Sequence, residues 1–206
     1  VFNSDGSDGG LAANPIRCAA KYLYDNKLTE GEEVAIECCG TVRTLTVSSF
    51  NGVARSVAVN LGKPECEKLG KERLNYDCQN PTIVKIGNEH CVVFVDNTDK
   101  VDMEEMWQSL ANDGIIEQNC FLECVRLVNN VTLKMRVYEK INGETYSCGS
   151  AAAAAAIAAI ENGACLSGET ITVKLKGGDL FVILKNNGEV ELDGSVKESF
   201  KGIIEI

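Results

Sequence analysis

Apolar residues recur at helical spacing near the start of the chain. In "NPIRCAAKYLYDN", Ile16, Ala19, Ala20 and Leu23 recur at helical spacing, which places them on one face of a helix. Asn14 is a suitable N-cap for this helix. Pro15 suits the first helical position, where a missing N–H costs nothing. We therefore expect a buried helix that begins directly after Asn14.

Two further segments predict helices. One begins near Ser150 and continues through a run of alanines to about Glu161, where "NG" at 162–163 provides a stop. The other spans 99–112, is amphipathic, and has aspartates suited to capping near its start.

Most of the remaining chain predicts short strands. These segments are rich in β-branched residues or alternate between apolar and polar residues, and turns such as N-G, G-G and N-N separate them. Many strands around a few helices indicate an α+β fold. The predicted strands cover 32–38, 42–50, 53–62, 81–87, 90–96, 121–129, 131–139, 170–177, 179–186 and 189–194.

The overall charge restricts the classes of ligand. The 206-residue chain carries a net charge of −10, which disfavours nucleic acid and anionic membranes because both require a basic surface. The longest apolar run, at 151–160, is too short to cross a bilayer, and no signal peptide is visible. We expect a cytoplasmic protein that binds a small molecule or a protein partner, with no nucleic acid and no membrane.

The chain has ten cysteines and one histidine, His90. With no C-x-x-C pair and a single histidine, a zinc site is not expected. Several cysteines lie within apolar strand-like runs, where a thiol acts as a small hydrophobic group. We therefore interpret most of them as reduced thiols, and expect context to single out any functional one.

Cys148 has such a context. The "NGET" segment predicts a turn, and Gly149 and Ser150 open the alanine-rich helix, so that Cys148 lies at the N-terminus of this helix. Unpaired N–H groups and the helix dipole favour an anion there, which predicts a lowered thiol pKa and a site for a substrate carboxylate. A structural thiol in a tight turn remains the alternative.

The surrounding motifs resemble a known family. "RVYEKINGETYSCGSAAAA" resembles the second active-site motif of diaminopimelate epimerases, R-V-x-E-R-G-x-G-E-T-x-x-C-G-T/S-G-A. "FNSDGSDGGLAANPIRCAAKYLYD" is similar to their first motif, and "IGNEHCVVFVDN" to their middle signature G-N-P-H-x-V. "NLGKP" and the terminal "LDGSVKESFKGIIEI" also fit, so the resemblance covers essentially the whole chain in the same order.

The resemblance implies an α+β fold of two pseudo-symmetric halves. Each half is a mostly antiparallel sheet or barrel wrapped around a central helix, and the active site lies in the cleft between them. The first half would comprise 1–62 and 200–206, and the second 63–199. Family members also carry several dozen residues before "FN", including a G-N-D-F loop, so we expect an N-terminal segment that this sequence lacks.

The same resemblance implies a racemase or epimerase that needs no cofactor and no metal. One cysteine thiolate removes the α-proton of an amino acid, and a second thiol on the opposite face returns a proton. A homodimer is one of the assemblies open to such a protein. The implied catalytic positions are Cys148, Ala12, Glu139 and His90, and the implied substrate-binding positions are Asn3, Ala13, Asn14, Asn88, Lys140, Gly149 and Ser150.

The chain departs from the family pattern at the first motif. Ala12 occupies the position of the first catalytic cysteine, and Ala13 and Pro15 replace glycines. Cys18 matches a second, non-catalytic cysteine about a turn and a half further along the helix. Because a positioned acid or base contributes about 10²- to 10⁴-fold in rate, two-base inversion should be impaired.

The far end of the substrate site also differs. Lys140 replaces the family arginine, and the asparagine that helps to hold a distal carboxylate corresponds to Phe121, or to Asn119 in another register. Arginine and lysine bind carboxylates differently, so the substrate can differ from diaminopimelate. Three hypotheses follow: an amino-acid racemase or epimerase, a one-base lyase or isomerase that uses Cys148 alone, and a non-catalytic amino-acid-binding paralogue.

Overall fold

The computed structural model describes residues 6, 12–69 and 78–203. Within them, the strands form a 12-stranded sheet in the order β1-β2-β3-β12-β11-β10-β8-β7-β6-β5-β4, with β9 paired to β8. The pairs β6–β7 and β8–β10 are parallel, and the others are antiparallel. The strands are β1 (Glu33–Cys38), β2 (Thr41–Phe50), β3 (Val53–Gly62), β4 (Glu65–Lys68), β5 (Gln79–Ile86), β6 (Asn88–Phe94), β7 (Phe121–Asn129), β8 (Thr132–Glu139), β9 (Gly143–Thr145), β10 (Ile171–Leu175), β11 (Gly178–Leu184) and β12 (Val190–Gly194).

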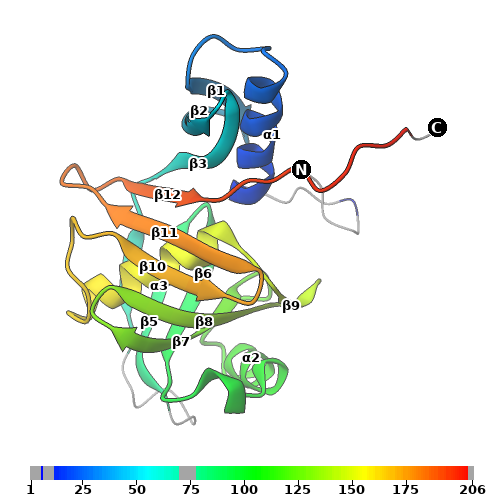
Figure 1. Ribbon diagram of the computed structural model, residues 1–206. Coiled ribbons are helices and arrows are strands. Elements are labelled where there is room, and N and C mark those ends of the chain that lie inside the picture. The colour runs from blue at the N-terminus through cyan, green and yellow to red at the C-terminus, as the bar shows by residue number, and fades with distance from the viewer. Residues whose placement is uncertain (1–5, 7–11, 70–77, 204–206) are drawn as a thin grey trace.

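The larger part of the sheet curves around one helix, α3 (Gly149–Glu161), as Figure 1 shows. This helix contacts β5, β6, β7, β8, β10, β11 and β12. Its residues from Gly149 to Ala159 are all buried, because alanine side chains let the strands approach the helix from every side. The alanine run therefore forms the central helix that the sequence predicts.

A second helix, α1 (Ala13–Asp25), packs on the smaller part of the sheet formed by β1, β2 and β3 (Figure 1). It buries Ile16 and Ala20 against these strands, whereas Ala19, which was expected on the same face, is exposed. The α+β class, with two helix-centred units in a mostly antiparallel sheet, is thus as expected. The division of the chain into halves at residue 62 remains a prediction, and residues 204–206 lie outside the described part.

The third helix, α2 (Met103–Asn112), covers the opposite face of the sheet from α3. Met103, Met106 and Trp107 are buried there, beside Cys91 and Cys124 from the strands. A short 3₁₀ helix, η2 (Thr98–Lys100), precedes it. Asp102 is the N-cap of α2, and its carboxylate accepts a hydrogen bond from the Glu105 N–H at 3.0 Å, as its side chain predicts.

The predicted N-cap of α1 is wrong. The helix begins at Ala13, and Ala12 occupies the cap position without any side-chain hydrogen bond to the helix. Asn14 lies in the first turn instead, because its side chain bonds to Ser147 and Arg17. The strands β4 and β9 are additional to those expected; both are short and polar and lack the alternation on which strand prediction depends.

Among residues 12–69 and 78–203, no helix combines the length and the hydrophobicity needed to span a membrane.

Candidate active site

The N-termini of α1 and α3 lie against each other. A Cβ atom added to Gly149, the first residue of α3, would lie 2.7 Å from the Cβ of Ala13, the first residue of α1. Ala12 and Cys148 occupy the N-cap positions of the two helices. Ala12 and Cys148 therefore occupy equivalent positions at the ends of two converging helices.

Neither helix has an acidic residue in its first turn, and neither N-cap residue, Ala12 or Cys148, provides a side-chain oxygen to cap its helix. The first-turn N–H groups, including those of Asn14 and Ser150, have no acceptor within their own helices and carry the positive ends of the helix dipoles. Two such ends at one place favour the binding of an anion, such as a carboxylate.

Asn14 links the two helix ends. Its Nδ2 donates to the carbonyl oxygen and to the hydroxyl oxygen of Ser147, both at 3.3 Å. Its Oδ1 accepts a hydrogen bond from Nη1 of the buried Arg17 at 3.1 Å. The Arg17 guanidinium also donates to the carbonyl oxygens of Val57 and Ser195. Arg17 therefore fixes the Asn14 amide, which fixes the segment that leads into Cys148.

The Cys148 thiol does not have the lowered pKa that the sequence predicts. Burial raises its pKa, and this effect exceeds the lowering by hydrogen bonds from the Ser150 hydroxyl and the Ala151 N–H. The Cys148 Sγ lies 3.5 Å from the Ser150 Oγ. The negative charges of Glu123 and Glu139 raise the pKa further. Desolvation thus raises the Cys148 pKa more than the hydrogen bonds at the helix N-terminus lower it. The resting sulfur is therefore a protonated thiol near neutral pH.

His90 and Glu123 form a buried pair near this end of α3. The His90 Nδ1 lies 2.7 Å from the Glu123 Oε1, and both side chains are fully buried. Burial raises the pKa of Glu123, while the His90 hydrogen bond and charge lower it. The influence of Glu123 on the Cys148 pKa shows that the pair lies within electrostatic reach of the thiol. His90 and Glu123 are therefore two titratable groups that are shielded from bulk water.

A pocket of 1230 Å³ lies beside these groups. Asn88, Glu139 and Lys140 line it, as does Phe121 at the position of the family asparagine. Ala12 and Cys148 are not among its lining residues. Of the lining residues, Glu139 also raises the Cys148 pKa through its negative charge. Asn3 lies outside the described residues.

Lys140 lines the pocket and contacts Gln118 and Trp107. Its Nζ donates to the Gln118 Oε1 and lies 5.7 Å from the centroid of the Trp107 ring. Asn119 and Phe121 line the same region. A lysine beside neutral and aromatic groups supplies one positive charge to this region, without the two-pronged contact of an arginine.

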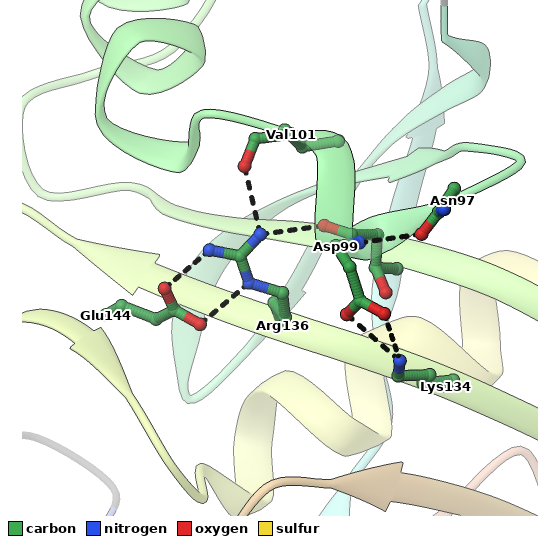
Figure 2. A network of polar contacts seen from close by, with 7 residues as sticks. Asn97, Asp99, Val101, Lys134, Arg136 and Glu144 are labelled. Carbon is green, nitrogen blue, oxygen red and sulfur yellow. Dashed lines mark hydrogen bonds and ion pairs between the residues drawn. The ribbon is translucent and has the colours of Figure 1, made fainter.

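A polar network links β8 to β9, the strand that precedes Cys148 in the chain, and to the η2 segment (Figure 2). Arg136 of β8 pairs with both carboxylate oxygens of Glu144 on β9, at 2.8 and 2.6 Å. It also donates to the carbonyl oxygens of Thr98 and Val101. Because β9 ends three residues before Cys148, this clamp limits the freedom of the turn that contains the thiol.

Sequence patterns did not indicate Glu123, Arg17 or the contact between Asn14 and Ser147. A signal for Glu123 exists in hindsight: in "FLECV", a carboxylate stands between apolar residues of a strand that is buried on both faces. Such a residue requires a buried partner. Its partner, His90, lies on the neighbouring strand 33 residues away, which the sequence alone does not place.

Comparison with known proteins agrees with this geometry. Residues 82–198 match the family model described as "Diaminopimelate epimerase". A curated diaminopimelate epimerase from Bacillus cereus is 33% identical over 219 residues, covering 100% of this chain and 76% of the relative.

Solved structures show the same fold at low sequence identity. A probable proline racemase from Agrobacterium radiobacter matches with a TM-score of 0.71 at 11% identity, covering 94% of this chain and 67% of the other. A phenazine biosynthesis protein from Bacillus anthracis matches with a TM-score of 0.68 at 15% identity, covering 98% and 79%. Together with the family match over more than half of its length, the curated relative shows that this chain belongs to the diaminopimelate epimerase family, a family of isomerases.

Proposed function

We propose that this chain exchanges the α-proton of an amino acid without a cofactor, with Cys148 as the acid and base. The observation that carries the proposal is the meeting of two uncapped helix N-termini with a thiol at one of them. The N–H groups there bind the α-carboxylate and stabilise the negative charge that develops when the α-proton leaves.

The proton transfer is balanced within the site. The thiolate of Cys148 takes the α-proton and becomes a thiol, and the substrate becomes a carbanion beside the helix ends. Return of this proton from Cys148 to the same face restores the centre, whereas inversion takes a proton from water on the opposite face, because Ala12 supplies no acid there. Because burial raises the pKa of Cys148, the thiol is also a competent donor in the reverse direction.

Diaminopimelate, converted from the LL to the meso form, or a related amino acid is the substrate that we propose. The curated relative is named for that activity. Such a reaction belongs to lysine biosynthesis in the cytoplasm, and the protein would act as a monomer or a homodimer on this small molecule. Lys140 and Phe121 in the pocket favour an amino acid whose side chain differs at its far end.

A second candidate is a one-base lyase or isomerase. The observation that favours it is Ala12, whose methyl group at the α1 N-cap cannot transfer a proton. In that case Cys148 removes the proton and either returns it to the same face or leaves an intermediate that loses a group from the neighbouring carbon. A non-catalytic amino-acid-binding protein is the remaining alternative.

Incubation with candidate L-amino acids in D₂O separates these functions. Deuterium at Cα with formation of the opposite configuration, seen by mass spectrometry and chiral chromatography, supports inversion. Deuterium with retained configuration, or elimination, supports one-base chemistry. Binding by calorimetry with no exchange on any tested amino acid supports the non-catalytic alternative. Cys148→Ala is the control and should abolish exchange in the first two cases.

A further inference from the structure

The buried pair of His90 and Glu123 contains two polar atoms without partners. The His90 Nδ1 bonds to the Glu123 Oε1 at 2.7 Å, and both side chains have an exposed fraction of 0%. Among the described residues, the His90 Nε2 and the Glu123 Oε2 have no hydrogen-bond partner. An unpaired, fully buried imidazole nitrogen is costly, so a use for it is expected.

The pair faces α3 rather than α2. On β6 and β7, Val92, Phe94 and Val125 pack in the core around α3, while Cys91 and Cys124 pack in the core beneath α2. Because side chains alternate along a strand, position 90 shares the face of Val92, and position 123 shares the face of Val125. Both groups therefore lie on the side of the sheet from which α3 presents Cys148 at its N-terminus.

A purely structural role does not account for a charged pair at this place. A buried carboxylate loses several kcal/mol of hydration, and apolar residues of similar volume are often as stabilising or more so, by roughly 1–4 kcal/mol. Around Glu123 the strand is otherwise apolar, so an apolar residue would fit the surrounding core. The hydrogen bond to His90 is the contact through which the Glu123 carboxylate acts.

We infer that Glu123 is a positioning residue for proton transfer at Cys148. Its carboxylate accepts a hydrogen bond from the Nδ1–H of His90, which holds the imidazole in one tautomer and leaves the Nε2 lone pair to exchange a proton with the thiol. This inference rests on the proposed role of Cys148 as acid and base.

The exchange step is balanced in protons and charge. The thiol proton moves to Nε2, the sulfur keeps the electron pair as a thiolate, and the imidazolium that forms is stabilised by the Glu123 carboxylate. The reverse transfer restores the thiol. The net charge of the three groups is unchanged, which limits the cost of the step in a buried environment.

His90 is the only histidine of the chain, so its tautomer can be read without assignment ambiguity. In protein labelled with ¹⁵N-histidine at pH 8, a long-range ¹H–¹⁵N correlation spectrum should show a protonated Nδ1 and an unprotonated Nε2. A wild-type spectrum with a protonated Nε2, as neutral tautomer or as imidazolium, overturns the inference. This measurement requires no substrate and no variant.

Glu123→Gln is the matching variant, because an amide can both donate and accept. The single tautomer should give way to a mixture or to the Nε2-protonated form. Where the wild type exchanges the α-proton, kcat should fall by roughly 10²- to 10⁴-fold with little change in KM. A variant that keeps the wild-type tautomer, or the wild-type kcat, contradicts the role of Glu123.

Cys124→Ala is the control for disturbance of β7. Cys124 is equally buried and follows Glu123 directly, but its side chain packs beneath α2. This variant should lower the melting temperature while leaving the His90 spectrum in the wild-type pattern. If the wild type exchanges no amino acid, the proposed function fails, whereas the tautomer measurement still decides the role of Glu123.

Discussion

The Asn14 side chain joins the two helix ends of the site: its Nδ2 lies 3.3 Å from the carbonyl oxygen of Ser147 and 3.3 Å from its hydroxyl oxygen. The contact links residues 133 positions apart. Because Ser147 directly precedes Cys148, the amide sets the placement of the thiol relative to α1. Substitution of Asn14 alone therefore removes both hydrogen bonds between the helix ends.

Replacing Asn14 with alanine removes this link and leaves an acceptor of the buried Arg17 missing. We expect the free energy of unfolding to fall by about 1–3 kcal/mol, which is typical when a buried polar partner is lost. Asn26→Ala at the other end of α1 removes an exposed hydrogen bond to Tyr22 and should cost less. Urea denaturation of both variants measures the difference, and equal losses would contradict a special role for Asn14.

Introducing a thiol at the α1 N-cap, Ala12→Cys, should promote inversion. The new sulfur would occupy the position equivalent to Cys148 on the converging helix and supply the second proton-transfer group. We expect the rate of inversion to rise by up to about 10²-fold relative to exchange with retention. Ala19→Cys adds a thiol to the exposed face of the same helix and should change neither rate. Chiral chromatography in D₂O gives both rates.

The contact between the helix ends should not tolerate a larger residue. A Cβ at position 149 would lie 2.7 Å from the Cβ of Ala13 and 2.7 Å from the Leu192 Cδ2. Gly149→Ala should therefore destabilise the fold by about 1–3 kcal/mol through overpacking.

The double variant Ala13→Gly with Gly149→Ala tests the source of this loss. It removes the backbone-attached methyl and leaves only the more adaptable Leu192 side chain in contact. Part of the stability should return, so that a double-mutant cycle gives a coupling energy above about 0.5 kcal/mol. An additive result would mean that the two helix ends do not touch.

The raised pKa of Cys148 predicts a steep pH dependence of its reactivity. Iodoacetamide modification at Cys148, followed by peptide mass spectrometry, should accelerate about tenfold per pH unit from pH 7 to 9, because only the thiolate reacts. A plateau below pH 8 would instead indicate a thiol already ionised by the helix.

Substitution of Ser150 should change the pH dependence of Cys148 modification. Its hydroxyl donates toward the sulfur and lowers the Cys148 pKa. Ser150→Ala should move the modification profile to higher pH, while Ser150→Thr, which keeps the hydroxyl, should leave it nearly unchanged. Identical profiles in all three proteins would show that the hydroxyl does not act on the sulfur.

Buried thiols should make the fold sensitive to alkali. Burial raises the pKa of Cys91, Cys124 and Cys165 in the folded protein. A raised folded pKa stabilises the fold below the unfolded pKa, and this stability is lost as the pH rises above about 8.5, by up to about 1.4 kcal/mol per pH unit and thiol. Urea denaturation under reducing conditions from pH 7.5 to 10 should show the decline, with a shallower slope for Cys91→Ala.

Most secondary structure follows from local patterns. The alanine run and the "NG" stop predict α3 almost to the residue, and ten observed strands coincide with segments of alternating or β-branched residues. The exceptions are β4 and β9, whose compositions do not alternate: β4 pairs with β5, and the ion pair between Glu144 of β9 and Arg136 of β8 supports the pairing of β9. The cap of α1 was misplaced because a distant contact, not the helix, uses the Asn14 side chain.

The site was only partly predictable, for a physical reason. Motifs identify Cys148, His90 and Glu139, but the thiol pKa depends on how much water the fold removes, which no local pattern reports. Glu123 was missed because its role depends on a partner from a parallel neighbouring strand. The electrostatics of the site depend on interactions between segments that are far apart in the sequence. Local sequence patterns do not report such interactions.

The place of β12 in the sheet has a consequence for how the molecule folds. This strand pairs with β11 on one side and with β3 on the other, and its pairing with β3 joins residues about 130 positions apart. Until β12 pairs with it, β3 has an exposed edge. We therefore expect slow, late assembly of the site during synthesis, with a vulnerable early intermediate that could pair wrongly with another copy of itself.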